Sequence, residues 1–362
     1  MSDLYDNRLN QVLDSMKKNN LTGLVVSDPK SIWYLTGIYN EPYERLFVLY
    51  LSADGNHVFF LNKLYNICQK KFREVWTSDT DDIMGSMASN VAKKGRIGID
   101  KVWPARFLIP LIKLNPDAEY VLGSDCVDDA RACKDAEEQR LMKEASRIND
   151  ECIQAGAVFV KEGITEKEVA EYIDKKFREL GADGNSFTTI VSFGKNAADP
   201  HHEPDDTVVK EGECVLIDMG CIKDHYCSDM TRTFFYKKEP TEEYAKIHDL
   251  VREANEKAES IIKPGVRLCD IDTAARNHIA SAGYGEYFTH RLGHFIGQTD
   301  HEMGDVSSTN TNTVKPGMIF SIEPGVYLPG KFGVRVEDLV LVTENGCEVL
   351  NKVDKHWKVL CK

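Results

Sequence analysis

Two aspartates in the middle of the chain lie at the ends of short apolar segments. Asp218 ends the run Cys214-Val-Leu-Ile, and Asp229 follows eleven residues later in the stretch VKEGECVLIDMGCIKDHYCSDMTRTFF (209–235). The apolar run is too short for a helix before Met219-Gly220, so we predict a β-strand that enters the core. An ionised carboxylate is costly to bury unless it is paired or binds a metal. The two aspartates therefore predict a bound cation.

The same phrase occurs again later in the chain. The segment VKPGMIFSIEPGVY (314–327) aligns with VKEGECVLIDMG, so that Glu323 falls on Asp218, and Glu337 follows as a second carboxylate. The repeat extends backwards, because 163–181 and 265–283 run between glycines over the same interval and read as helical. Two copies indicate a closed domain and not a solenoid. We predict a pseudo-twofold site at which four acids converge.

Five of the ten histidines lie in loop-like or strand-like segments near these acids: His201, His202, His290, His294 and His301. Glycines at 293 and 297 argue against a helical two-histidine zinc motif in FTHRLGHFIGQTDHE (288–302). We expect one of these histidines, on an extended segment, to complete the carboxylate set. His202 is predicted to be solvated.

Composition excludes several classes of protein. The formal net charge of −13 argues against a nucleic-acid surface, and no apolar run approaches membrane-spanning length. The polar start, MSDLYDNRLNQ, lacks the apolar core of a signal peptide, so a cytoplasmic location is predicted. The ten cysteines include no CxxC pair and are interpreted as reduced thiols.

The chain divides into two predicted domains, 1–130 and 131–362. The first alternates helical and strand-like segments as an α/β layer domain and contains no catalytic constellation. The pattern loosens around 123–134. A helix that opens with the capping box Thr165-x-x-Glu168 follows in the second domain.

The contexts IDMG, SDMTRTF, HRLGH, IEPG and VRVED resemble the five metal-ligand motifs of the pita-bread metallopeptidases. The resemblance covers about 230 C-terminal residues, and the N-terminal part resembles the domain carried by prolidases, aminopeptidase P and creatinase. It implies a mixed α/β (α+β) fold, in which a creatinase-like N-terminal domain precedes a pseudo-twofold pita-bread catalytic domain.

The resemblance also implies a metal site with two divalent ions and five ligands: Asp218, Asp229, His294, Glu323 and Glu337. In this assignment Asp218 and Glu337 bridge the ions, Asp229 and His294 complete the two ends, and Glu323 is also the proton shuttle. Oxygen-rich ligation with one imidazole suits Mn²⁺, with Co²⁺ or Zn²⁺ as alternatives. Two such ions can share a water, make hydroxide at neutral pH and polarise a carbonyl group.

Further residues match the family's substrate-binding groups. His201 and His301 would hold the substrate carbonyl and the tetrahedral intermediate, and His290 would line a proline pocket. Arg291 or Arg335 is the candidate for a substrate carboxylate. Arg335 has an equal alternative role as a structural cation among the acids.

The two-domain build favours hydrolysis of the bond before proline, in Xaa-Pro dipeptides, by a metal-dependent hydrolase. The alternative is an aminopeptidase P that acts on longer Xaa-Pro peptides, and a non-peptidase hydrolase or binding module of this fold ranks below both. A homodimer is expected by analogy. Two departures from the family pattern, Phe295 and the Gln-Thr-Asp before His301, are expected to reshape the substrate pocket.

Overall fold

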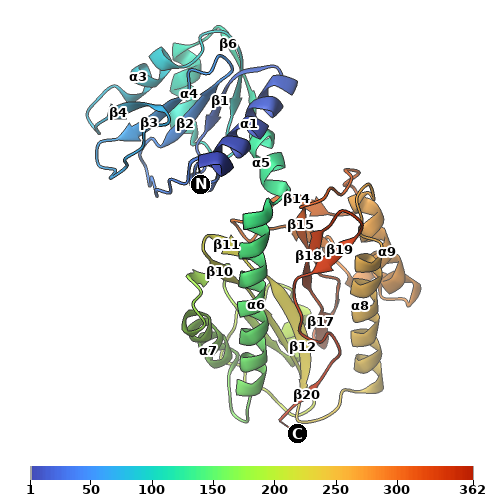
Figure 1. Cartoon of the computed structure of the whole chain (residues 1–362). Helices are drawn as coiled ribbons and strands as arrows, with labels where there is room; N and C mark the ends of the chain where they lie inside the picture. Colours follow the sequence, from blue (N-terminus) through green and yellow to red (C-terminus); the bar gives the residue numbers. More distant parts are fainter. Residues whose placement is uncertain (1, 362) are drawn as a thin grey trace. The chain divides into compact units, whose positions relative to one another are not determined.

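The computed structural model describes residues 2–361, which form two compact units, Met1–Arg131 and Ala132–Lys362 (Figure 1). Each unit combines helices with β-sheets and contains hydrophobic clusters of its own. The predicted mixed α/β fold class is therefore confirmed.

The first unit is built on a six-stranded sheet of order β4-β3-β2-β1-β5-β6. The β1–β5, β5–β6 and β3–β4 pairs are parallel, whereas β1–β2 and β2–β3 are antiparallel. Its strands are β1 (Leu21–Val26), β2 (Val48–Ser52), β3 (Val58–Asn62), β4 (Arg73–Thr77), β5 (Gly95–Ile99) and β6 (Ala118–Leu122). Its helices are α1 (Ser2–Lys18), α2 (Pro29–Thr36), α3 (Ile83–Asn90), α4 (Ala105–Leu114) and α5 (Asp125–Ala132), the last of which ends one residue into the second unit.

This sheet is buried on both faces, which explains the continuous apolar sequence of its central strand. Successive side chains of a strand point to opposite faces. Leu24 and Val26 of β1 pack in one hydrophobic cluster, and Val25 packs in another. A strand covered on both sides therefore has apolar residues at successive positions.

The second unit contains two pairs of long helices and two larger sheets. The helices are α6 (Ala136–Phe159), α7 (Glu166–Glu179), α8 (Glu242–Ser260) and α9 (Leu268–Ser281), with 3₁₀ turns η1 (Gly194–Ala198) and η2 (Gly285–Tyr287). One sheet has the order β20-β12-β9-β8, with strands β8 (Ile190–Phe193), β9 (Cys214–Met219), β12 (Met230–Tyr236) and β20 (Val359–Leu360). The other has the order β14-β13-β15-β18-β19, with strands β13 (Gly293–Phe295), β14 (Glu302–Val306), β15 (Ile319–Ile322), β18 (Asp338–Val342) and β19 (Cys347–Val349). Smaller sheets are formed by β7 (Gly184–Asn185), β10 (Cys221–Lys223) and β11 (Tyr226–Cys227), and by β16 (Gly325–Leu328) and β17 (Phe332–Arg335).

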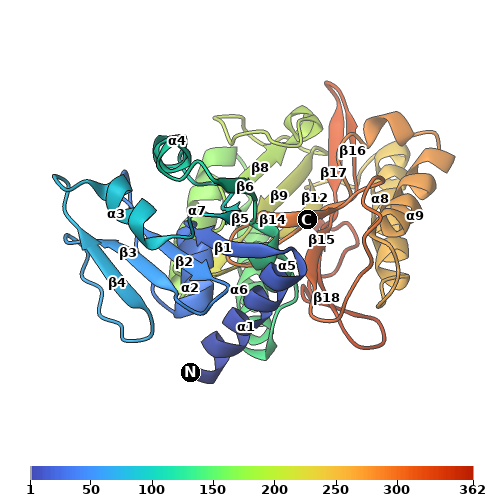
Figure 2. The same ribbon diagram turned by 90° about the horizontal axis from the view of Figure 1, so that it is seen from above.

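The sequence repeat has a structural counterpart in the backbone. In each half, a glycine with positive φ precedes the second helix of the pair (Gly163, 77°, and Gly265, 89°), and another ends it (Gly181 and Gly283, both 87°). The capping box at Thr165 is present, with Glu168 bonded back to the cap. Figure 2 shows the strands of both halves between α7 on one side and α8 and α9 on the other.

The paired strands bring the acids of each half to one end of a hairpin. Asp218 of β9 pairs with Thr231 of β12, so that Asp229 lies just before β12. Ile322 of β15 pairs with Asp338 of β18, so that Glu323 and Glu337 occupy the residues immediately beyond this pair. Antiparallel register therefore determines that the two acids of each half are neighbours.

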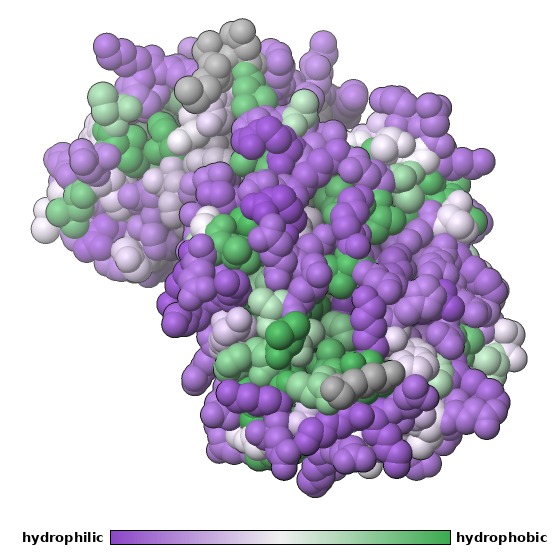
Figure 3. Space-filling view, turned by 60° about the horizontal axis from the view of Figure 1, so that its bottom comes forward, coloured by the Kyte–Doolittle hydropathy of each residue, from purple (hydrophilic) through white to green (hydrophobic). Residues whose placement is uncertain are grey.

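Hydrophilic side chains dominate the surface of the protein on the face drawn in Figure 3. Apolar residues lie in smaller areas between them. Among residues 2–361, no helix has the length and hydrophobicity needed to cross a membrane.

The close packing of α6 on α7 generates a stability prediction. A Cβ atom at Gly156 would lie 2.9 Å from Cγ1 of the buried Ile173. We expect Gly156→Leu to lower the free energy of unfolding by about 1–3 kcal/mol, because overpacking forces strained side chains and backbone shifts. Val158→Leu is the matched control, since Val158 lies on the same helix and is 83% exposed. Guanidinium chloride titration measures both variants, and equal midpoints would contradict the packing argument.

Candidate metal centre

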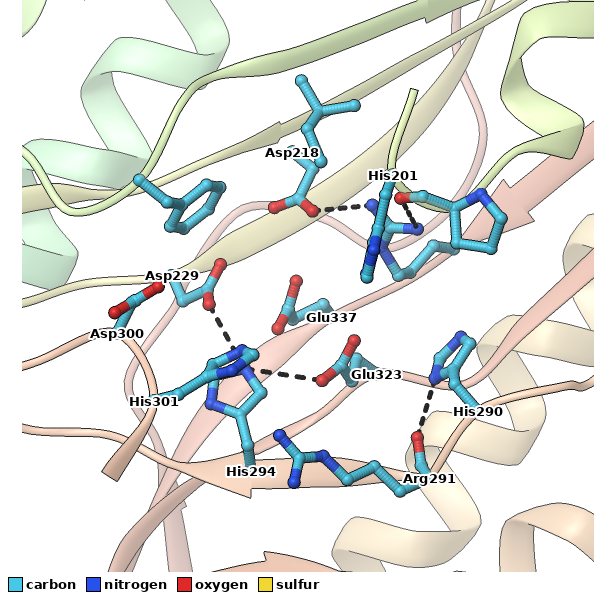
Figure 4. Close-up of a pocket in the computed structure, with 14 residues that line it drawn as sticks. His201, Asp218, Asp229, His290, Arg291, His294, Asp300, His301, Glu323 and Glu337 are labelled. Carbon is cyan, nitrogen blue, oxygen red and sulfur yellow. Dashed lines mark hydrogen bonds and ion pairs between the residues drawn. The ribbon is translucent and has the colours of Figure 1, made fainter. Parts of the chain in front are cut away.

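A pocket of about 310 Å³ in the second unit gathers the residues selected from the sequence (Figure 4). The five candidate metal ligands and the five other candidate site residues all line it. Its lining consists of Phe187, Ile190, Pro200, His201, Asp218, Asp229, His290, Arg291, His294, Asp300, His301, Glu323, Arg335 and Glu337.

His294 lies on β13, an extended segment, as the two nearby glycines suggested. Gly293 permits β13 to approach β15, because a Cβ there would meet the Ser321 carbonyl oxygen at 1.9 Å. The His294 ring contacts the Phe295 carbonyl oxygen through Nδ1 at 3.2 Å, and Nε2 lies 3.5 Å from both Asp229 Oδ2 and Glu323 Oε1. If Nδ1 carries the proton and donates it to the carbonyl, Nε2 has a free lone pair directed at the acids.

The acids form a buried, mutually repelling cluster. Burial, and then the charge of Asp218, raises the pKa of Asp229 well above its ordinary value. Burial, and then Asp229, raises the pKa of Glu337. Burial also raises the pKa of Glu323 to about 7, against the opposing effect of His294. Such groups stay partly protonated at neutral pH unless a cation replaces the protons.

The donor set fits divalent cations. Ligand atoms of Asp229, His294 and Glu337 lie within 4.8 Å of one another. One oxygen each of Asp218 and Asp229 is buried without a hydrogen-bond partner. Buried polar atoms are rarely left unpaired. Oxygen ligands with one imidazole nitrogen and no thiolate match hard or borderline divalent ions.

Arg335 is committed to the acid cluster. It is 3% exposed, and its guanidinium donates to Asp218 Oδ2 at 2.6 Å and to Thr231 Oγ1 at 3.0 Å. It also donates to the Tyr327 hydroxyl at 2.9 Å and the Pro200 carbonyl oxygen at 3.3 Å. Few of its five N–H groups remain for a ligand. Of its two alternative roles, the contacts favour the structural cation.

Arg291 differs, because its guanidinium forms no hydrogen bond or ion pair with another residue in the described part of the chain. It is half-buried and lines the pocket.

Tyr327 is a site residue that the sequence analysis missed. Arginine can only donate, so the Tyr327 hydroxyl accepts from Arg335 and has its own proton for His290 Nε2 at 2.9 Å. His290 Nδ1 then donates to the Arg291 carbonyl oxygen at 2.7 Å. Burial, and then Arg335, lowers the pKa of His290 to about 4, so its ring is neutral. The position of Tyr327 at the end of the repeated phrase was the available signal.

His201 and His301 both line the pocket. Burial, and to a smaller extent the nearby His294, lowers the pKa of His301 to about 4. The centroids of the His294 and His301 rings are 4.0 Å apart. The residue after His301 is held by a buried ion pair, Lys134 Nζ to Glu302 Oε2 at 3.0 Å.

The prediction that His202 is solvated was wrong. His202 is half-buried, and its Nε2 lies 2.7 Å from Oε2 of the fully buried Glu166. The same carboxylate accepts from the backbone N–H groups of Phe193 and Asp205 and from Asn196 Nδ2. All its lone pairs are therefore used. Ligand atoms of Glu166, His202 and Asp205 lie close enough together to hold a metal ion. Because the Glu166 carboxylate is already fully hydrogen-bonded, we assign this cluster to the stabilisation of the loop that carries His201.

The expectation that Phe295 reshapes the pocket was also wrong. Phe295 is 3% exposed, belongs to the main hydrophobic cluster and packs on Phe320 at 5.5 Å between ring centroids. The Gln-Thr-Asp departure does affect the pocket, because its Asp300 lines it.

Family models match both units of the chain. Residues 140–344 match metallopeptidase family M24, and residues 8–133 match the creatinase/prolidase N-terminal domain. A Staphylococcus aureus protein described as an uncharacterized peptidase is 39% identical over 359 residues, which is 96% of this chain and 99% of the relative.

Solved structures agree with these matches. A dipeptidase from Pyrococcus horikoshii OT3 is 35% identical with a TM-score of 0.92, covering 98% of this chain and 100% of the other. A prolidase from Thermococcus sibiricus is 32% identical with a TM-score of 0.92, covering 98% and 99%. The resemblance inferred from the five motifs is confirmed at the level of the family: the chain is a metal-dependent peptidase and belongs to metallopeptidase family M24.

Proposed function

We propose that this peptidase hydrolyses Xaa-Pro dipeptides with the help of two divalent metal ions. The observation that carries the proposal is the convergence of four acids and His294 in one pocket, with buried carboxylate oxygens that lack partners. The names of the dipeptidase and prolidase with similar structures support the choice of substrate. The alternative remains an aminopeptidase P that acts on longer peptides.

The proposed ligands are Asp218, Asp229, His294, Glu323 and Glu337, with Mn²⁺ as the first candidate and Co²⁺ or Zn²⁺ as alternatives. Asp229 interacts with Asp218 on one side and with His294 on the other. These two contacts make Asp229 the central member of the set that would hold the ions. Bound ions would polarise the scissile carbonyl group and acidify a water molecule.

The chain's own groups would move protons and stabilise charge. Glu323 is proposed as the proton shuttle, which would accept a proton from the attacking water molecule and return it to the leaving group. Neutral His301 can donate an N–H to an oxygen that becomes negative during the reaction. His201 is proposed to do the same from the opposite loop.

Arg291 is the proposed receptor for the proline carboxylate. It lines the pocket and has no competing partner in the described chain, unlike Arg335. His290 lies beside it as a neutral ring, suited to packing against the proline. A dipeptide has its carboxylate on the proline itself, whereas in a longer peptide that carboxylate becomes an amide.

A cytoplasmic homodimer accompanies this proposal. The ten cysteines are free thiols, which supports a reducing compartment. The dimer rests on the family resemblance alone.

Substrate length and metal dependence test the proposal together. The protein is stripped with a chelator, Mn²⁺ is added back, and hydrolysis of Ala-Pro is compared with that of Ala-Pro-Ala. We expect cleavage only after metal is restored and a clear preference for Ala-Pro. Preference for the tripeptide would move the assignment to aminopeptidase P. Activity that survives exhaustive chelation would overturn the metal mechanism.

Removal of the Arg291 charge tests carboxylate recognition. A charge-assisted hydrogen bond contributes about 1.5–3 kcal/mol, so Arg291→Met should raise the KM for Ala-Pro by about 10- to 100-fold. The kcat value should change little. The control is Arg267→Met, because Arg267 pairs with Asp270 on the surface and lies outside the pocket. An unchanged KM in Arg291→Met would exclude this role.

Proton linkage tests the metal cluster. In metal-free protein the pKa of Glu323 is raised from 4.5 to about 7. The stabilisation that the protonated Glu323 side chain gives to the folded state is therefore complete below about pH 4.5 and is lost as the pH rises through about 7. Metal replaces that proton, so added Mn²⁺ should raise Tm more at about pH 8 than at about pH 5.5. The free energy of metal binding should change by about 1.4 kcal/mol for each proton displaced and each pH unit. Calorimetry with and without Mn²⁺ measures this, and Glu323→Gln should reduce the slope. A shift in Tm that is independent of pH would refute the linkage.

A further inference from the structure

Asp300 is an acid in the pocket that is not one of the five assigned metal ligands. It is half-buried and lines the pocket next to Asp229 and His301. Its carboxylate forms no hydrogen bond or ion pair with another residue in the range 2–361. The neighbouring loop carboxylate of Glu302, in contrast, is paired with Lys134.

Asp300 has no cationic partner within the protein. Among residues 2–361 no lysine or arginine forms an ion pair with its carboxylate, and the neighbouring His301 is a neutral ring. An unpaired carboxylate that faces a pocket is best matched by a cation on the ligand.

The position of Asp300 indicates which part of the substrate it would meet. Figure 4 shows Asp300 on one side of the acid cluster, beside Asp229, while His290 and Arg291 lie on the other side. If Arg291 holds the proline carboxylate, the scissile bond lies over the acids between these sides. The Xaa residue then extends toward Asp300.

We propose that Asp300 is a specificity residue that selects dipeptides with a cationic Xaa side chain, lysine or arginine. This inference rests on the proposed Xaa-Pro dipeptidase function and deepens it. The α-ammonium group, which every Xaa-Pro dipeptide carries, has Asp229 and the other acids nearby. Asp300 lies farther along the pocket than these acids, where it can form an ion pair with the Xaa side chain.

Matched substrates separate the side chain from the α-ammonium group. Lys-Pro and norleucyl-Pro have side chains of similar length and differ in charge, and Glu-Pro reverses the charge. We expect the wild type to prefer Lys-Pro over norleucyl-Pro by about 5- to 30-fold in kcat/KM, as for a partly buried ion pair. Glu-Pro should be the poorest of the three.

Asp300→Asn keeps the size of the side chain and removes its charge. We expect the Lys-Pro preference to fall to about unity while kcat/KM for norleucyl-Pro stays within about 2-fold. Asp300→Lys should reverse the order and favour Glu-Pro. Asp305→Asn is the control, because Asp305 lies on β14, bonds to Ser307 and Asn310 and does not line the pocket.

Three results would overturn the proposal. An equal loss for all three dipeptides in Asp300→Asn would assign Asp300 to the α-ammonium group. A loss of one bound Mn²⁺ per chain in that variant, measured as a lower stoichiometry by calorimetry without substrate, would make Asp300 a metal ligand. Wild-type enzyme that cleaves the three dipeptides equally would exclude charge selection. Failure to cleave any of them would instead refute the proposed dipeptidase function.

Discussion

The second unit must hold several buried carboxylates together against their mutual repulsion, and the rest of its structure is arranged around this requirement. Four acids meet in one pocket, and three of them have raised pKa values because burial and their neighbours oppose ionisation. One hydrogen bond from Arg335 compensates Asp218, but the second oxygen of Asp218 and one oxygen of Asp229 have no hydrogen-bond partner. The surrounding structure must therefore hold these acids in place at a cost in stability. Cations that bind there recover part of that cost, so metal binding and folding are coupled.

A second layer of charges holds the main chain behind the ligands. The buried Arg232 on β12 donates to the Glu337 carbonyl oxygen at 2.6 Å and to Asp338 Oδ1 at 2.7 Å. Lys355, near the C-terminus, contacts Asp338 at 2.9 Å and Glu259 at 2.6 Å. These contacts join the hairpin of one half, the hairpin of the other half and the C-terminal segment. The Glu337 carboxylate is thus oriented both through its backbone and through the hydrogen bond that Thr231 Oγ1 donates to its Oε2 at 2.6 Å.

Local sequence patterns were sufficient to select the four acids because the chemistry and the strands coincide, whereas the choice of His294 among the histidines came from the family resemblance. An acid at the end of a buried strand is visible in the sequence, and its duplication identifies the second hairpin. The partners that decide the roles of Arg335 and His202 are not local. Arg335 contacts Asp218 across 117 residues, and His202 contacts Glu166 across 36. The prediction for Phe295 was wrong for a similar reason, since the packing of this side chain against Phe320 depends on the pairing of β13 with β15.

The two halves of the catalytic unit are not independent sites. The group of potential ligands Asp229, His294 and Glu337 takes its first member from the first half and the other two from the second. Neither hairpin alone supplies an imidazole together with both central acids. An ion in this position therefore stabilises the association of the halves as well as the local site.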